Sequence, residues 1–179
     1  MYRHILLAVA LQQWEEPSPH ALAAREVAVT LAEGVGARLS VLSVYDYGHL
    51  EEPGLPLEMA SQSGAEVMRQ LEAATKRREE HIRQIDAQME TKMRGFAACV
   101  PERDPPVTPL LKVGEPRPLI ISAAETLGVD LIVIGAHSKR GFLDVLLGGT
   151  AAYVSRHAAC PVLMVQPGPG AQHRTAATA

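Results

Sequence analysis

The residues best suited to bind a charged ligand lie in one stretch, VDLIVIGAHSKRGFLDVLLGGTAAYV, which runs from Val129 to Val154. An apolar run ends there at Gly135, and Gly148, Gly149 and Thr150 begin a helical pattern. A helix N-terminus presents unpaired N–H groups and the positive end of the helix dipole, so it attracts anions. Glycine at a strand end allows a close backbone approach or a positive φ. The stretch therefore predicts a site for phosphate or a nucleotide.

The same residues also fit a loop that binds nothing. Glycines are common at strand ends and helix starts in any α/β protein, and loop cations such as Lys139 and Arg140 are usually solvated. The spacing matches neither a Walker loop, which needs a glycine-lysine-hydroxyl run, nor the dinucleotide fingerprint. The residues alone leave both interpretations open.

Two pairs of residues invite a catalytic interpretation, namely His137 with Ser138 and Ser155 with His157. Near neighbours in sequence do not generally present their side chains to each other, and no acidic residue is placed to orient either histidine. We therefore predict no catalytic residues and no enzyme. Slow ATP hydrolysis stays open as a side reaction, although no general base is evident.

The rest of the chain alternates between strand and helix patterns. Ser18 before Pro19 predicts a helix start, and Gly34 is a candidate for its end. The predicted strands span 5–9, 38–45, 107–114, 129–135 and 160–167, and the predicted helices span 19–34, 65–98, 114–128 and 148–157. Such alternation is typical of a parallel sheet covered on both faces, with a flavodoxin-like or Rossmann-like topology. Ligands of these sheets bind at the carboxyl ends of the strands.

The domain organisation predicted from these patterns is simple. Residues 1–167 form one domain, and 168–179 form a polar, flexible tail. The segment 46–64, with its prolines and glycine, is a long irregular connection of the kind that often has a function. Pro109 favours an edge position for the third strand.

Composition excludes several classes of protein. The chain has 179 residues, 47% of them hydrophobic, and a formal net charge of -3, which gives no basic surface for nucleic acid. Its two cysteines, Cys99 and Cys160, match no metal site and no disulfide framework. No apolar stretch approaches the roughly 20 residues that span a bilayer. We expect a cytoplasmic protein without a membrane or metal partner.

Three segments resemble the universal stress protein family, and together they cover nearly the whole chain. They are HILLAVA, GARLSVLSVYD and GEPRPLIISAAETLGVDLIVIGAHSKRGFLDVLLGGTAAYVSRHAACPVLMVQP. The resemblance implies a Rossmann-like, adenine nucleotide α-hydrolase-like sheet of five parallel strands in the order 3-2-1-4-5. It also implies a homodimer formed through the last strand, at Val162, Leu163, Met164 and Val165. That strand is apolar, and an apolar edge strand invites pairing.

The resemblance also implies a set of ligand contacts. Nucleotide-binding members have Gly, two residues, Gly, nine residues, Gly and then Ser or Thr across this loop. Gly135 and Gly148 match the first and third glycines, whereas Ser138 replaces the second and Gly149 replaces the hydroxyl residue. Thr150 follows one place later and is a candidate substitute.

Three further residues complete the predicted site. Ala10 stands where nucleotide-binding members usually have an aspartate that meets the ribose or adenine. Val44 matches a position that packs on adenine, and His137 lies in the glycine loop. Each lost hydrogen bond costs about 0.5–1.5 kcal/mol, so the departures at Ala10, Ser138 and Gly149 weaken binding by roughly one to three orders of magnitude.

Two functions of different classes follow. In the first, the protein is a stress-response protein that binds ATP or AMP weakly, with Mg²⁺ in the case of ATP. In the second, it has kept the fold without the nucleotide and acts through protein partners, by means of its dimer and its long charged helix. Gly135 and Gly148, which match two glycines of the family motif, favour the first function, and the departures from the motif favour the second.

Overall fold

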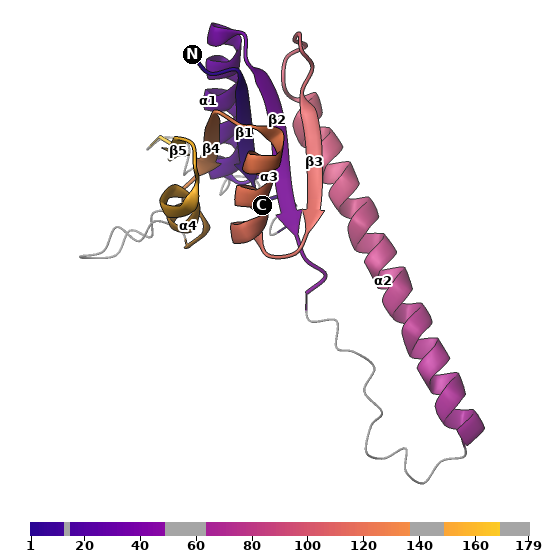
Figure 1. The fold of residues 1–179 in the computed structure, drawn as a ribbon. Coiled ribbons are helices and arrows are strands. Elements are labelled where there is room, and N and C mark those ends of the chain that lie inside the picture. Colours follow the sequence, from indigo (N-terminus) through magenta and orange to yellow (C-terminus); the bar gives the residue numbers. More distant parts are fainter. Residues whose placement is uncertain (13–14, 49–63, 137–148, 169–179) are drawn as a thin grey trace.

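The computed structural model describes residues 1–12, 15–48, 64–136 and 149–168 of the chain (Figure 1). Strands and helices alternate along it, as the sequence patterns predict. The strands are β1 His4–Val9, β2 Arg38–Tyr45, β3 Thr108–Val113, β4 Leu131–Gly135 and β5 Val162–Val165. The helices are α1 Pro19–Val35, α2 Gly64–Ala98, α3 Pro116–Leu127 and α4 Gly149–His157.

The five strands form one parallel sheet in the order β3-β2-β1-β4-β5. This confirms the predicted fold class and strand order. The two edges are β3 and β5, and Pro109 lies in the edge strand β3, where a missing N–H does not interrupt a central ladder. From β1 the chain adds β2 and β3 on one side and then β4 and β5 on the other, so the strand order reverses beside β1.

Local signals set the helix ends. The Ser18 hydroxyl accepts a hydrogen bond from the Ala21 N–H and caps α1, as predicted. Helix α1 runs to Val35, one residue beyond the predicted end, because Gly36 and not Gly34 takes the left-handed conformation, at φ 67°. This geometry lets the Ala37 N–H bond to the Ala32 carbonyl at 2.9 Å, which closes the helix.

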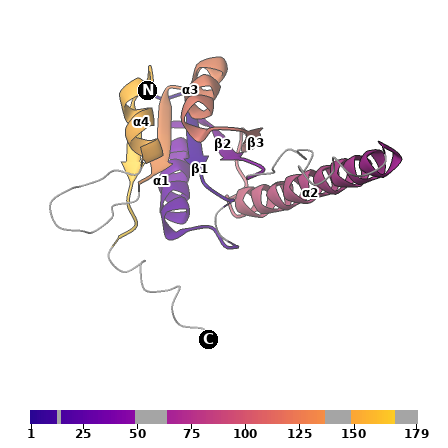
Figure 2. The same cartoon turned by 90° about the horizontal axis from the view of Figure 1, so that it is seen from below.

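Helices cover both faces of the sheet (Figure 2). On one face, α1 and the C-terminal part of α2 pack against residues such as Ile5, Leu7 and Val41. On the other face, α3 and α4 pack against Leu6, Leu42 and their neighbours. Every residue of β1 is buried, as expected of a central strand that is covered on both sides.

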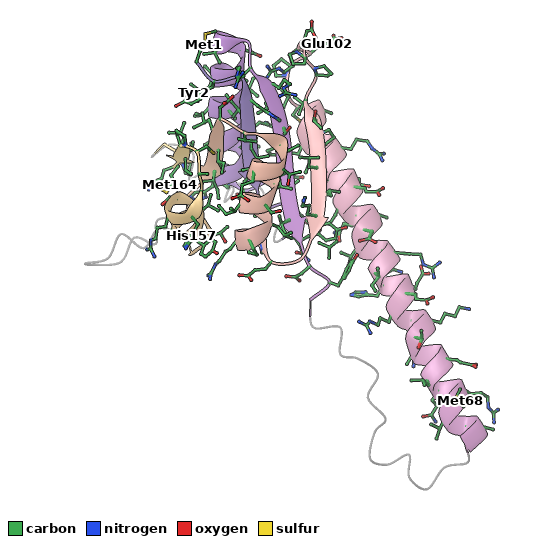
Figure 3. The ribbon with its side chains drawn as sticks, viewed as in Figure 1. Met1, Tyr2, Met68, Glu102, His157 and Met164 are labelled. Atoms are coloured by element: carbon green, nitrogen blue, oxygen red, sulfur yellow. The ribbon has the colours of Figure 1, made fainter. Side chains whose placement is uncertain are left out.

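Helix α2 extends well beyond the sheet, in both views of the fold (Figures 1 and 2). Its buried residues, Met89, Met93 and Phe96, all lie near its C-terminal end. Met68, near the other end, is 55% exposed and lies far from the sheet in Figure 3. Within the part of the chain that the structure describes, no helix is long and apolar enough to cross a membrane.

Candidate functional site

A pocket of about 300 Å³ opens at the carboxyl ends of the strands. Its walls are the ends of β1, β2 and β4 and the first turns of α1, α3 and α4. The pocket lies beside β1, where the strand order reverses, which is the usual ligand position in open α/β sheets. Its volume is at the lower end of the range for small-molecule sites.

Five of the eight predicted site residues line this pocket, namely Ala10, Val44, Gly135, Gly149 and Thr150. They come from β4, from the ends of β1 and β2 and from the start of α4, so the fold brings together residues that lie far apart in sequence. The other three, His137, Ser138 and Gly148, lie outside the described residues.

Gly135 is required by packing as well as by any ligand. A Cβ atom at this position would lie 2.9 Å from the backbone oxygen of His20, in the first turn of α1. Gly135 is not among the positive-φ glycines of the described residues. The close approach that the sequence predicts at this strand end is therefore made by a helix of the protein itself.

The three helix N-termini at the pocket differ in what they offer an anion. The Ser18 side chain already caps α1. Pro116 and Pro118 remove two N–H groups from the first turn of α3. Helix α4 begins with Gly149 and Thr150, whose N–H groups have no partner within an α-helix. Of the three helix N-termini, the start of α4 therefore offers the most backbone N–H donors to a bound anion.

A carboxylate that the sequence analysis did not select also lines the pocket. Asp46 follows β2, and its carboxylate accepts a hydrogen bond from the Gly48 N–H at 2.7 Å. The Gln12 side chain bonds to both backbone groups of Asp46, and its Oε1 accepts from the Asp46 N–H at 3.0 Å. This clamp joins the chain after β1 to the chain after β2.

A second overlooked residue is Arg117, in the first turn of α3. Its Nη2 atom lies 2.9 Å from the position that a Cβ of Gly149 would occupy. The guanidinium carbon also lies 6.0 Å from the centre of the Tyr153 ring, on α4. The sequence did contain a signal for Arg117, because it follows the carboxyl end of β3 by a few residues. The carboxyl ends of parallel strands lie on one side of the sheet, where ligands bind.

The pocket is also connected to the long helix. Tyr45 is one of the residues that line the pocket, and its hydroxyl donates to the Asp86 carboxylate on α2 at 2.8 Å. Burial, together with this hydrogen bond, raises the pKa of Tyr45 well above its usual range. Tyr45 is therefore protonated at neutral pH and serves as a donor.

Ser155 and His157 do not form a nucleophile and a base. The Ser155 hydroxyl donates to the Ala152 carbonyl, and the His157 Nδ1 lies 2.8 Å from the Tyr153 carbonyl. The His157 ring also stacks on Tyr153, with ring centres 4.0 Å apart. Both side chains bond to the last turns of their own helix, as predicted for His157.

Comparisons with known proteins agree on one family. The model of the universal stress protein family matches residues 1–166. A universal stress protein of Thermus aquaticus is 32% identical over 168 residues, which cover 93% of this chain and 100% of the relative. Three further curated universal stress proteins are 37–42% identical, but the match spans only 36–38% of their own lengths.

Solved structures share the fold. The universal stress protein UspA from Lactobacillus plantarum has a TM-score of 0.52 and 24% identity, and the match covers 91% of this chain and 98% of that one. A universal stress protein solved in complex with cAMP has a TM-score of 0.51 and 17% identity, over 93% of this chain and 99% of that one.

Proposed function

We propose, from the premise that this chain belongs to the universal stress protein family, that its pocket binds an adenine nucleotide weakly. The single observation that carries the proposal is the pocket itself. Its lining combines an apolar surface, which includes Val44, with the N-terminus of α4, at the point where the strand order reverses. An adenine ring packs on an apolar surface, and a phosphate binds to a helix N-terminus.

The pocket residues suit the parts of a nucleotide. Leu42, Val44 and Ile134 offer an apolar surface to the base. The first turn of α4 offers N–H groups and the Thr150 hydroxyl to the phosphate. Asp46 supplies, after β2, the carboxylate acceptor for a ribose hydroxyl that Ala10 lacks at the end of β1.

The size of the pocket favours a mononucleotide over a triphosphate. At about 300 Å³ the pocket is small for a drug-sized site. Asp46 is the one carboxylate among its described lining residues, so these residues offer little to hold the Mg²⁺ that accompanies a triphosphate. We therefore propose AMP as the first ligand to test and ATP, with or without Mg²⁺, as the second. The cAMP complex of a solved relative supports this choice of ligand class, since it combines the same fold with an adenine mononucleotide.

Isothermal titration of nucleotide-stripped protein with AMP and ATP, with and without Mg²⁺, tests the proposal. We expect a Kd for AMP between about 10 µM and 1 mM, which corresponds to roughly 4–7 kcal/mol. The absence of both heat and thermal stabilisation at millimolar nucleotide would contradict nucleotide binding.

A pair of variants locates the site. Thr150→Glu places a negative charge in the first turn of α4, where the helix dipole tolerates it but a phosphate does not. Thr150→Gln has a similar size and no charge. We expect the Glu variant to lose AMP binding and the Gln variant to retain most of it. Equal affinities would mean that the phosphate lies elsewhere.

One observation favours a second function, that of an interaction module without a nucleotide. The N-terminal part of α2 extends beyond the sheet and carries exposed side chains such as Met68 (Figure 3). Such a helix offers a surface for a protein partner. Neither function involves catalysis, and we propose that the protein is not an enzyme.

The proposed functional unit is a homodimer of the domain formed by residues 1–167, located in the cytoplasm. Strand β5 is an edge strand, and Leu163 is 36% exposed on it. Its unpaired backbone groups and apolar side chains suit pairing with the same strand of a second copy. Cys99 and Cys160 are free cysteines, which suits a reducing compartment.

A further inference from the structure

The space beside Gly149 that a side chain would take is occupied by the tip of Arg117. A serine or threonine at this position would bring its Cβ to 2.9 Å from the Arg117 Nη2 atom and displace the guanidinium. The Arg117 guanidinium therefore occupies the space that a side chain at residue 149 would take. The hydroxyl that the family motif has at this place and the guanidinium of Arg117 are alternatives.

The guanidinium lies near the start of α4, close to Gly149 and to one aromatic ring of that helix. The ring of Tyr153, one turn further along α4, lies 6.0 Å from the guanidinium carbon, within the range of a cation–π contact. Neither of the two ion pairs between described residues involves Arg117. The side chain is exposed and lies at the rim of the pocket, next to the lining residue Gly149.

The backbone around Arg117 fits this role. Pro116 and Pro118 fix φ on either side of it and remove two of the N–H groups with which α3 would otherwise meet an anion. Helix α3 lines the pocket with Pro116 and Ile120, and Arg117 adds a side-chain cation at the rim of the pocket. A guanidinium has a planar set of donors that matches two oxygens of one phosphate.

We infer that Arg117 binds the phosphate of the nucleotide in place of the missing hydroxyl at Gly149. The inference rests on the proposed function and deepens it. The guanidinium and the first N–H groups of α4 converge on one phosphate group, so the ligand class is an adenine mononucleotide with free phosphate oxygens. The phosphate then lies between α3 and α4, over Gly149.

Titrations of AMP and adenosine test this assignment. We expect Arg117→Gln to weaken AMP binding about ten- to hundredfold and to leave adenosine binding unchanged, because only the phosphate contact is lost. The control is Arg38→Gln, which removes the same charge at the start of β2, at the opposite end of the sheet. That variant should bind both ligands like the wild type.

A double variant separates a phosphate contact from an effect on folding. Gly149→Ser in the Arg117→Gln background puts the hydroxyl into the space left by the guanidinium, and we expect it to restore part of the AMP affinity. In the wild-type background the same Gly149→Ser change displaces Arg117, so it should bring no comparable gain. Equal gains in the two backgrounds would overturn the idea that the groups are alternatives.

The outcomes distinguish this inference from the proposed function. If the wild type binds AMP and Arg117→Gln binds it equally well, the inference is wrong and the nucleotide site stands. If AMP and adenosine bind the wild type with equal affinity, there is no phosphate contact and the inference is also wrong. If neither ligand binds the wild type, both proposals fail.

Discussion

Gly135 serves the packing of the sheet and the shape of the pocket at the same time. It lies at the end of β4 and lines the pocket. Because it has no Cβ atom, the first turn of α1 can pack close to its backbone. The atoms that a side chain would meet there include the backbone carbonyl of His20, which cannot move without moving α1. A glycine at this strand end is therefore needed for the fold even without a ligand.

Replacing Gly135 with alanine tests this requirement. We expect a loss of about 1–3 kcal/mol in the free energy of unfolding, the usual cost of forcing an extra carbon into a packed site. Gly95→Ala is the control, because a Cβ at Gly95 meets no atom within 4 Å and alanine favours a helix interior. That change should stabilise the protein by about 0.5–1 kcal/mol. Urea unfolding measures both, and equal effects would refute the packing argument.

The sequence predicts the types of the site residues better than their partners. Gly135, Gly149 and Val44, which the sequence selects as candidate site residues, all line one pocket. Their contacts with His20 and Arg117 join positions far apart in the chain, and a single sequence contains no signal for such distances. Asp46 was overlooked because the expected carboxylate position, Ala10, follows β1, whereas Asp46 follows β2.

At the level of elements, α2 divides into two parts with different energetic roles. The C-terminal part buries Met89, Met93 and Phe96 against the sheet and α1. The N-terminal part carries its charges as local pairs, such as Arg69 with Glu66 at 2.9 Å, between exposed side chains. Pairs of this kind contribute little to stability, so the stability of α2 comes from its buried end.

A pair of methionine variants measures this division. Met89→Ala removes a fully buried side chain, and we expect it to lower the free energy of unfolding by about 2–5 kcal/mol. Met68→Ala removes the same atoms from the exposed end of the same helix, and its effect should stay within about 0.5 kcal/mol. Chemical denaturation of both variants gives the comparison. A large loss for Met68→Ala would mean that the outer part of α2 packs against something in the free protein.

The sequence patterns predict the bounds of α2 to within one residue but not its direction. Its apolar positions and charges fix a helix from residue 64 to 98, whereas its course beyond the sheet depends on which few side chains reach the core. The end of α1 shows that the local sequence can also leave a helix boundary undecided. Gly34 and Gly36 are both suitable helix stops, and only the hydrogen bonds of the following turn decide for Gly36.

At the level of the whole molecule, the strand order places the candidate ligand pocket beside β1 and leaves β3 and β5 as open edges. Reversal of the order beside β1 separates the helices that follow β1 and β4, and the pocket opens between them. The edges are β3 and β5, and both expose an apolar residue, Val113 at 44% and Leu163 at 36%. Exposure alone therefore does not decide which edge pairs.

The side chains of the two edge strands favour β5 for the dimer. Strand β3 contains Pro109, which has no N–H to donate, and the charged Lys112, whereas each of the four residues of β5, Val162–Val165, has an apolar side chain. Leu163→Lys adds a charge to the proposed interface, and Val113→Lys adds the same charge to the other edge. Lysine on an edge strand opposes strand pairing, so we expect the first variant to become monomeric and the second to remain a dimer. Sedimentation velocity at several protein concentrations measures the two masses. A dimer that survives Leu163→Lys and dissociates with Val113→Lys would move the interface to β3. A monomeric wild type would remove the dimer from the proposed function. The nucleotide pocket would be unaffected, because it lies within one chain.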